Sequence, residues 1–545
     1  MQSPLIKLLR FLKVEIIETL SKAGSEPDKV MGQSKCSNCC SLSTLIIWTL
    51  ASHVKWFNIA AEYALFLLMA YLTDAWGLGF AHAAAIINIW TGFSKLLSLY
   101  GAYLTDKNQG IENSRMLLYS SIVYSIGLAF LYMSTPPVLD NMAGNCSEDL
   151  PDCYGPAQKA TFYISLVLTG VGMAGHAVSL DPFLDERGVN AEGFCNVKSM
   201  FNKLMRGVIA GVSSLLLPQH WSARFGIVAI YGFAATIALA IANGIYKEDE
   251  ENTNGTEKKT KKKDEKINFC KMFNQTAMVW PSFIMCGVVS SIGNTFFVEQ
   301  ADRMKPTAGV YTVPLGVLLL LANAAKFILT QCFSASNDLM KKVFDWCHLI
   351  LTNCFGVVDD GIKKLAPLFG IGIAMLNAVL CCLAAAVVEN IRRKDTMKEY
   401  LHHDSKFWLV PQFVFLIAID AFLQVSVHDF FQGYEGEAAS GDQSLKKYSI
   451  QFTNFVMGLG FIGSVVSVLA VARISKSVTG KSWIQKEVTD SRLENYYWVL
   501  AVLSSINVVY YVIAAICYTR KASKKKTPAG ADSKEQKGKT GCCSC

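Results

Sequence analysis

Long apolar stretches recur along almost the whole chain, separated by short polar segments. Each reaches about the 20 residues that one helical crossing of a bilayer needs. We expect helical spans near residues 46–72, 80–105, 115–134, 160–180, 199–217, 224–246, 275–298, 309–333, 366–389, 407–430, 449–473 and 495–518. No large polar domain lies between these spans, so the membrane-embedded part must carry the function. Polytopic chains of this shape usually move solutes.

The longest polar break between the spans is residues 247–266, which read KEDEENTNGTEKKTKKKDEK. Such a charged segment cannot bury a core, so we expect a disordered cytosolic linker that divides the spans into six and six. The predicted domains are a cytosolic N-terminal tail (1–45), an N-terminal six-helix bundle (46–246), the charged linker (247–270), a C-terminal six-helix bundle (271–518) and a basic, Cys-ending cytosolic tail (519–545).

Composition agrees with a membrane protein. Of 545 residues, 52% are hydrophobic and only 17% are charged, whereas a soluble protein has about 25% charged residues. The net charge of +8 comes from basic residues gathered in the tails and the linker. Such residues face an anionic cytosolic leaflet, so they do not imply nucleic acid, and both termini are expected in the cytosol.

Two segments fit this topology less simply. Residues 390–406 contain Arg392, Arg393 and Lys394 and yet must face outside, which is an exception to the charge rule. Residues 334–365 mix charged and apolar positions, a pattern compatible with an interfacial helix, and no function follows from it.

Two features outside the spans are candidates for modification. The outward loop 136–158 carries an acceptor triplet at Asn145 and a cysteine pair, Cys146 and Cys153. Glycosylation of Asn145 and a disulfide between the two cysteines are alternatives. At the C-terminus, Cys542, Cys543 and Cys545 follow a lysine-rich tail, which suits reversible acylation, with unmodified thiols as the alternative.

Several motifs are more specific than hydropathy. They are the segments NTFFVEQ (294–300), WLVPQF (408–413), DAF (420–422), TGKSW (479–483), RLENYYWVLAVLSSIN (492–507) and GAYLTD (101–106). Together they resemble the proton-dependent oligopeptide transporter family, and within it the plant nitrate transporter and peptide transporter branch. The resemblance covers about residues 45 to 520.

The resemblance implies an all-α polytopic protein with the major facilitator fold, in which 12 transmembrane helices form two six-helix bundles. It implies a substrate cavity near the bilayer midplane and alternating access by rocking of the two halves. Substrates in this family are nitrate, small peptides, plant hormones and glycosylated metabolites, and most members couple transport to protons. Plasma membrane and vacuolar membrane both suit the family.

The chain departs from the family at two places that handle protons. The first span usually carries an ExxER pattern, and the matching residues here are Val54 to Asn58, without either glutamate or the arginine. The fourth span usually carries a lysine, which aligns with Ala177. Alanine, valine and asparagine cannot titrate, so coupling is either lost or taken over by other groups.

Replacement groups lie close in sequence. Glu62 follows Asn58 by one helical turn and Lys55 by two, roughly on one face, and His176 adjoins the lost lysine position. A histidine titrates near physiological pH. The alternative is structural: Lys55 and Glu62 pair in the cavity wall, and His176 makes one hydrogen bond.

Four further charges lie within spans or at their ends. Lys95 and Lys326 are expected to line the cavity, because a lysine facing lipid costs about 3 kcal/mol. Glu299 and Asp429 end the seventh and tenth spans, where they are candidates for a paired gate or for the cavity wall.

These observations favour a secondary transporter of small solutes, of the nitrate, peptide or organic-anion class, with lost or altered proton coupling. A sensor on the same fold that binds without transport is the alternative. No nucleophile with a base, no metal-ligand spacing and no phosphate loop supports an enzyme. The expected partners are a small-molecule substrate and the lipid bilayer, without cofactor, metal or nucleic acid, and the oligomeric state is open.

Overall fold

The computed structural model describes residues 42–105, 111–135, 155–186, 220–253, 278–304, 307–308, 311–312, 325, 329, 362–397, 406–433 and 443–524. The elements before the linker are α2 (Leu42–Phe66), α3 (Leu68–Ala70), the π-helical turn η1 (Tyr71–Ala75), α4 (Phe80–Leu104), α5 (Asn113–Met133), α7 (Pro156–Glu186) and α9 (Trp221–Thr253). After it come α11 (Pro281–Gly293), α12 (Phe296–Arg303), α15 (Ile362–Met397), the 3-10 turn η5 (Lys406–Leu409), α16 (Val410–Gly433), α17 (Gln443–Thr479) and α18 (Leu493–Lys524). Two strands of two residues, β1 (Thr307–Ala308) and β2 (Tyr311–Thr312), form an antiparallel pair.

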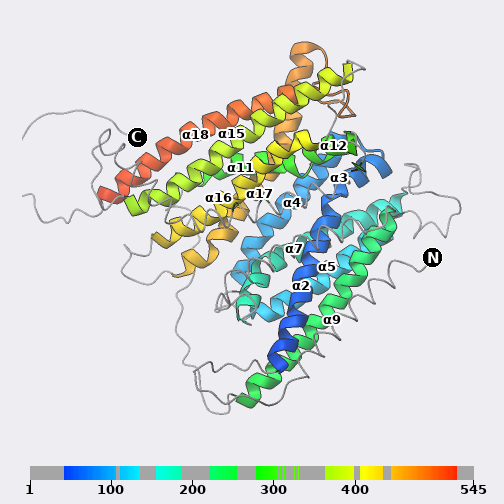
Figure 1. Cartoon of the computed structure of the whole chain (residues 1–545), viewed down its shortest axis with the longest axis vertical. Helices are drawn as coiled ribbons and strands as arrows, with labels where there is room; N and C mark the ends of the chain where they lie inside the picture. The colour runs from blue at the N-terminus through cyan, green and yellow to red at the C-terminus, as the bar shows by residue number, and fades with distance from the viewer. Residues whose placement is uncertain are drawn as a thin grey trace, which may run out of the picture.

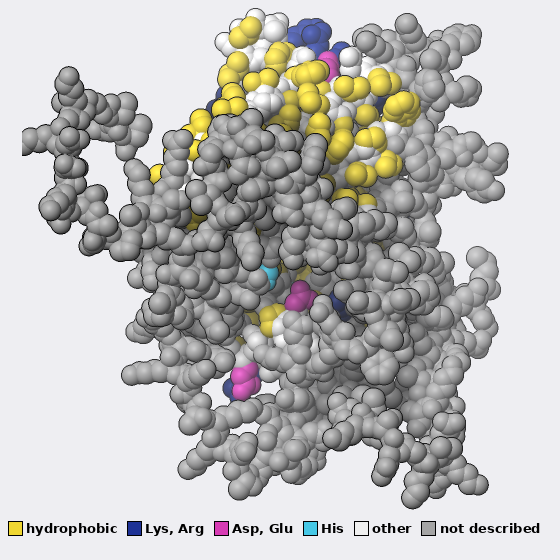
Figure 2. All heavy atoms as spheres, turned by 60° about the vertical axis from the view of Figure 1, so that its left-hand side comes forward, with side chains coloured by type: hydrophobic (Ala, Val, Ile, Leu, Met, Phe, Trp, Pro, Cys, Tyr) yellow, Lys and Arg dark blue, Asp and Glu magenta, His cyan; other side chains and the backbone are white. Residues whose placement is uncertain are grey.

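Nine helical stretches among the described residues are long and apolar enough to cross a membrane. Their outward surfaces are apolar too, as on α18, where Val502, Ile506, Val509 and Ile513 are exposed. Figure 2 shows a mainly hydrophobic surface on the upper part of one face, with basic side chains at its top. Exposed apolar bands of this kind require lipid as the solvent, so the chain is an integral, multi-pass membrane protein.

Helix α4 has the length of a span but is less apolar than these nine. It packs between α7 and α17, and Asn88, Ser94 and Ser98 are buried there. Asn88 donates to Ser464 Oγ at 3.1 Å and Ser94 to the Gly170 carbonyl at 3.0 Å. A helix can keep polar residues on the face that it buries against other helices, as long as those helices satisfy them.

The described helices pack as two groups (Figure 1). In the N-terminal helices, α5 lies against α7 and α9, and α2 lies against α9. In the C-terminal helices, α15 lies against α16 and α18, and α11 lies against α17. The predicted linker, of which residues 247–253 belong to α9, falls between the two groups. The expected span near 199–217 lies outside the described residues. Of the expected span near 309–333, the described residues are Tyr311 and Thr312, which form β2, and Ala325 and Leu329, which are helical. The prediction that this helix begins at residue 309 is therefore wrong at Tyr311 and Thr312.

Helices α4 and α17 join the two groups along a closely packed seam. A Cβ atom at Gly458 of α17 would lie 2.9 Å from the Gly92 carbonyl oxygen, and a Cβ atom at Gly92 would lie 2.8 Å from Ile462. Glycine is therefore required at both positions for the helices to approach this closely.

Two helices are interrupted at comparable depths, one in each group. In the N-terminal helices, α2 breaks at Leu67 and continues as α3 and η1. In the C-terminal helices, α11 ends at Gly293, and α12 begins after Thr295, whose backbone is non-helical. A Cβ atom at Gly293 would lie 2.0 Å from Leu416 Cδ2, so a larger residue at this break would force the Leu416 side chain to move. Interrupted helices and π-helical turns often mark functional sites.

The expectation that residues 390–406 form a loop with unpaired positive charge is wrong for its first part. Helix α15 continues to Met397, and Arg392 is buried against Glu389. Arg393 forms an ion pair with Glu494 at the start of α18. Both charges are neutralised within the protein, which removes most of the conflict with the charge rule. Residues 101–104 form the last turn of α4, within the expected span near 80–105.

Candidate functional site

A cluster of four polar side chains connects the two groups of helices just beyond both interruptions. We call Thr73, Asp74, Glu299 and Arg303 the inter-half cluster. Thr73 Oγ1 donates to Glu299 Oε2 at 2.8 Å. Arg303 donates through Nε to Glu299 Oε1 at 3.0 Å and through Nη2 to Asp74 Oδ1 at 2.8 Å. One hydrogen bond and one ion pair therefore cross between the halves.

The local helix geometry places these side chains. The π-helical turn η1 has Thr73 and Asp74 next to each other at the end of the first span, on the side that meets α12. On α12, Glu299 and Arg303 are four residues apart, so they lie on one helical face and pair within the helix. Each half supplies two neighbouring groups from the short element after its break.

The two contacts across the halves differ in their exposure to solvent. The side chain of Glu299 is 2% exposed, whereas those of Arg303 and Asp74 are 41% and 39% exposed. A hydrogen bond to a buried carboxylate is strong, because the carboxylate loses water without it. A half-exposed ion pair contributes much less. The Thr73–Glu299 hydrogen bond is therefore the stronger link.

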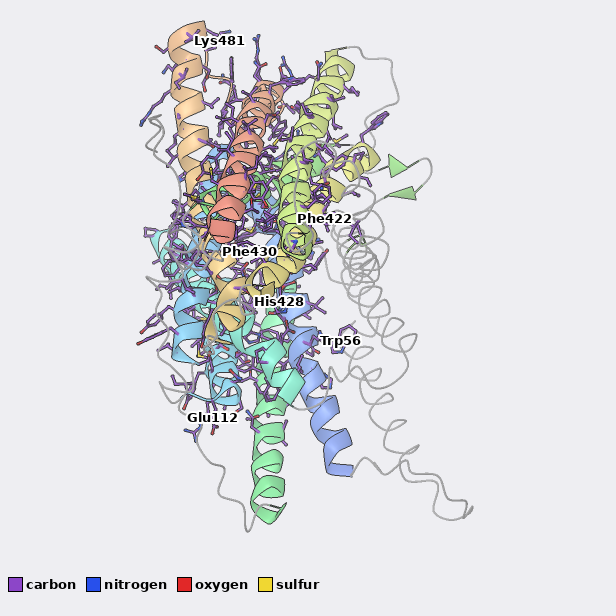
Figure 3. All side chains as sticks on the ribbon, turned by 90° about the vertical axis from the view of Figure 1, so that its left-hand side faces the viewer. Trp56, Glu112, Phe422, His428, Phe430 and Lys481 are labelled. Carbon is purple, nitrogen blue, oxygen red and sulfur yellow. The ribbon has the colours of Figure 1, made fainter. Side chains whose placement is uncertain are left out.

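Backbone and aromatic contacts reinforce the cluster at the same end of the bundle. The amide of Phe80, the first residue of α4, donates to the Lys486 carbonyl oxygen at 3.1 Å. The Phe80 and Phe296 rings meet at 5.4 Å. Lys486 belongs to residues 481–492, which connect α17 to α18. Figure 3 shows Lys481 at one end of the bundle and Glu112 at the opposite end, and we refer to the first as the Lys481 end.

Along α2, the candidates Asn58 and Glu62 interact as their spacing predicts. Asn58 Nδ2 donates to Glu62 Oε1 at 2.8 Å. Glu62 is exposed, and Lys55 on the same face is half-buried, while the opposite face buries Phe57 and Ala61. This places an ionisable face near the middle of the span His53–Ala75. The pairing of Lys55 with Glu62 in the cavity wall stays a prediction.

His176 lies inside the N-terminal helices and not at their surface. It is 2% exposed, and its Nε2 is 2.9 Å from Ser121 Oγ. The rings of Phe57 and Tyr124 lie edge-on to it, at 6.0 and 5.4 Å. The structure thus shows a buried histidine with one side-chain hydrogen bond, as the structural alternative predicts, while a role in proton handling stays a prediction.

The remaining candidates fall into two sets. Lys95 lies on α4 at the seam, where its ammonium is 5.5 Å from the centre of the Phe461 ring, so it contacts the other half. Lys326, Asn145, Cys542, Cys543 and Cys545 lie outside the described residues, and for Asp429 only the helical backbone of α16 is described. Within the described ranges, no three His, Cys, Asp or Glu side chains come together as a metal site would need.

Sequence reasoning named Glu299 but missed its three partners. Thr73 has no charge that would single it out, and Asp74 and Arg303 follow the apolar stretches as ordinary flanking charges. The contact joins residues 226 positions apart, which no local pattern shows. A usable signal was that both interrupted spans end in a polar pair.

Known proteins resemble this chain in sequence and in fold. No family model matches it. Protein NRT1/PTR FAMILY 5.5 of Arabidopsis thaliana is 26% identical over 540 residues, which cover 86% of this chain and 96% of that protein. The POT family transporter PepTSo superposes with a TM-score of 0.57 at 13% identity, over 88% of this chain and 99% of its own. A POT family transporter in complex with 5-aminolevulinic acid superposes with a TM-score of 0.51 at 10% identity, over 87% and 96%.

The chain is a polytopic membrane protein with the major facilitator fold, and its homologues are membrane transporters and not enzymes. By sequence, the chain is similar to the NRT1/PTR family proteins, as its motifs predict.

Proposed function

We propose that this protein is a secondary transporter of small solutes that works by alternating access, and that the inter-half cluster is its gate at the Lys481 end. The observation that carries the proposal is the pair of contacts between the halves, Thr73 with Glu299 and Asp74 with Arg303. They close this end of the bundle. With both termini in the cytosol, as the charge distribution predicts, the Lys481 end faces away from the cytosol.

Opening of this gate requires few changes. The Thr73 and Asp74 contacts break, and water replaces them, while Glu299 keeps Arg303 as a partner on its own helix. The interruptions before η1 and α12 let these short elements move relative to α2 and α11. The glycine-lined seam between α4 and α17 stays packed and acts as the pivot.

The ionisable face of α2 is the best candidate for contact with substrate. An exposed glutamate in the middle of a span is costly against lipid, so we place Glu62 in a water-filled cavity between the halves. Lys55 and Asn58 on the same face add a positive charge and an amide. Such a surface suits a small solute with an anionic group and hydrogen-bond donors, within the nitrate, peptide or organic-anion class. The solved relative that binds 5-aminolevulinic acid is consistent with this range.

Proton coupling is altered in this proposal, because the first-span set is absent and Glu62 is displaced from it by one turn. Exposure favours Glu62 over the buried His176 as a replacement carrier. The membrane is the plasma membrane or the vacuolar membrane.

The test is flux in proteoliposomes with a gate that can be locked. A Cβ atom at Gly79 would lie 3.4 Å from Lys486 Cγ and 3.7 Å from Lys486 Cα, across the two halves. A Gly79→Cys/Lys486→Cys pair should therefore form a disulfide when the gate is closed. Flux of nitrate, a dipeptide and a panel of organic anions is measured with and without a pH gradient, before and after oxidation.

We expect oxidation to abolish flux and a reductant to restore it, while each single cysteine variant keeps full flux. Undiminished flux through fully cross-linked protein would contradict the gate. Saturable ligand binding without flux in the unmodified chain would instead support the sensor alternative. Flux that is unchanged by the pH gradient would show that coupling is lost.

A further inference from the structure

A second polar network lies behind the gate, wholly within the C-terminal helices. Gln300, the neighbour of Glu299 on α12, donates Nε2 to Glu389 Oε2 on α15 at 2.7 Å. Arg392 donates two hydrogen bonds to the same carboxylate, from Nε to Oε2 at 2.8 Å and from Nη2 to Oε1 at 2.7 Å. The side chains of Glu389 and Arg392 are 0% and 7% exposed, so the pair is shielded from solvent.

Arg392 extends this network to the segment 481–492. Its Nη2 also donates to the carbonyl oxygen of Val488 at 3.3 Å. Two residues earlier in that segment, the Lys486 carbonyl accepts the Phe80 amide from the N-terminal helices. A continuous chain of hydrogen bonds therefore runs from α12, through α15, to the segment that touches α4.

The physical effect of such a pair is mainly geometric. Burial of two charges costs desolvation that their attraction barely repays, so a buried ion pair adds little net stability compared with apolar side chains of similar size. The two-armed guanidinium–carboxylate contact joins two residues of α15 and so fixes the orientation of both side chains on that helix. In that orientation Glu389 accepts from Gln300 of α12, and Arg392 donates to Val488 of the segment 481–492. Both α12 and this segment contact the N-terminal helices.

We infer that Glu389 and Arg392 are positioning residues that join α12 to the segment 481–492, so that both parts leave the N-terminal helices together when the gate opens. The inference rests on the gate proposed above and adds the device that makes it open as one unit. Without the pair, α12 can separate from η1 while the segment stays in contact with Phe80.

The Phe80 amide is a natural reporter for this coupling. As the first residue of α4 it has no hydrogen-bond acceptor within its own helix, so its protection from hydrogen exchange depends on the Lys486 carbonyl. Thr73→Val weakens the other part of the gate, at α12. Exchange at Phe80 is measured in lipid nanodiscs by mass spectrometry with overlapping peptides, with and without Thr73→Val.

The same comparison is then made in Glu389→Gln/Arg392→Met. This double variant keeps an acceptor for Gln300 and leaves no buried unpaired charge. It removes the hydrogen bond from Arg392 to the Val488 carbonyl oxygen. A matched control is Arg393→Met/Glu494→Gln. It removes a less buried ion pair, one residue further along α15, whose side chains are 24% and 13% exposed and which joins α15 to the first turn of α18.

We expect Thr73→Val to accelerate exchange at Phe80 by about tenfold or more in the unmodified chain and in the control, since a lost hydrogen bond to a charged group is worth at least about 1.5 kcal/mol. In Glu389→Gln/Arg392→Met we expect less than a twofold effect. A purely structural role would lower stability but leave the tenfold effect intact, and that result would overturn the inference.

Two further outcomes are separable. If Thr73→Val has no effect even in the unmodified chain, the proposed gate itself fails, and with it the inference. If the double variant does not fold, Arg392→Lys is measured in its place. Lysine keeps a positive charge beside Glu389 but cannot form the bidentate contact of a guanidinium. Coupling that survives Arg392→Lys at full strength would likewise overturn the inference.

Discussion

Thr73→Val is the most informative single change at the gate. Valine has nearly the same shape as threonine, so packing around the π-helical turn is kept and only the hydroxyl is lost. That hydroxyl is near the carbonyl oxygens of Met69 at 3.1 Å and Ala70 at 3.3 Å, but the carboxylate of Glu299 is its shortest contact, at 2.8 Å. Its single proton therefore goes to Glu299, across the halves.

The size of the effect follows from burial. In the closed state of Thr73→Val, the buried Glu299 carboxylate loses the hydroxyl that donates to it, whereas in the open state water can donate instead. A hydrogen bond to a charged group is worth about 1.5–3 kcal/mol, which shifts the closed-to-open equilibrium by about 10- to 150-fold at 1.4 kcal/mol per factor of ten.

Asp74→Asn gives the comparison within the same cluster. It removes the charge opposite Arg303, where both side chains are about two-fifths exposed. Water screens such a pair, so its loss costs about 0.2–1 kcal/mol, or a shift of about 1.5- to 5-fold. The hydroxyl is therefore expected to hold the gate more firmly than the ion pair.

The assay is hydrogen exchange at the Phe80 amide, whose rate follows the open fraction, with transport rates measured on the same preparations. The amides in the middle of α5 serve as an internal reference, because they lie within the N-terminal helices and should not respond. If Asp74→Asn accelerates Phe80 exchange more than Thr73→Val does, the ranking by burial is wrong. If neither changes it, the inter-half cluster does not close the gate.

Two further predictions concern packing. Gly458→Val should lower the thermal unfolding temperature and reduce flux, because a Cβ atom at this position would lie 2.9 Å from a carbonyl oxygen of α4. Overpacking of this kind costs about 1–3 kcal/mol. Gly463→Val is the control in both measurements, because the nearest contact of its Cβ atom is 3.8 Å away. Ser121→Ala should lower the free energy of unfolding by about 1–3 kcal/mol, measured by thermal unfolding, because it removes the side-chain partner of buried His176. Ser120→Ala loses only a hydrogen bond within its own helix and should lower this free energy less. Equal losses in the two variants would contradict this account.

Most of the helices could be predicted from the sequence, because lipid imposes a length and an apolar composition on every span. The ends of the helices could not. The charges of residues 392 and 393 indicate a loop by composition, but α15 continues through them since Glu389 and Glu494 neutralise both arginines. Helix α4 shows another case: its polar residues Asn88, Ser94 and Ser98 are buried where it packs against α7 and α17, whereas Ile89, Phe93 and Tyr100 are exposed.

The site was less accessible to sequence reasoning. The pairing of Asn58 with Glu62 follows from helical spacing, and the structure shows it at 2.8 Å. The contact of Thr73 with Glu299 depends instead on how two halves meet, and hydropathy contains no information on that. The interruptions that bring these residues together are also invisible in the apolar pattern, since Leu67 and Thr295 stand in stretches that read as continuous spans.

The proposed mechanism separates gating from proton coupling. Val54 to Asn58, which differ from the family's proton set, lie in α2 several turns before η1, and Ala177 lies in α7. The proposed gate uses other residues, at the ends of both interrupted spans. A change in the proton set therefore leaves the gate contacts in place, and the halves can still alternate while the coupled ion changes or is lost. On this account, Glu62→Gln should change the response of flux to a pH gradient without changing exchange at the Phe80 amide, whereas Thr73→Val should change that exchange in the absence of any gradient.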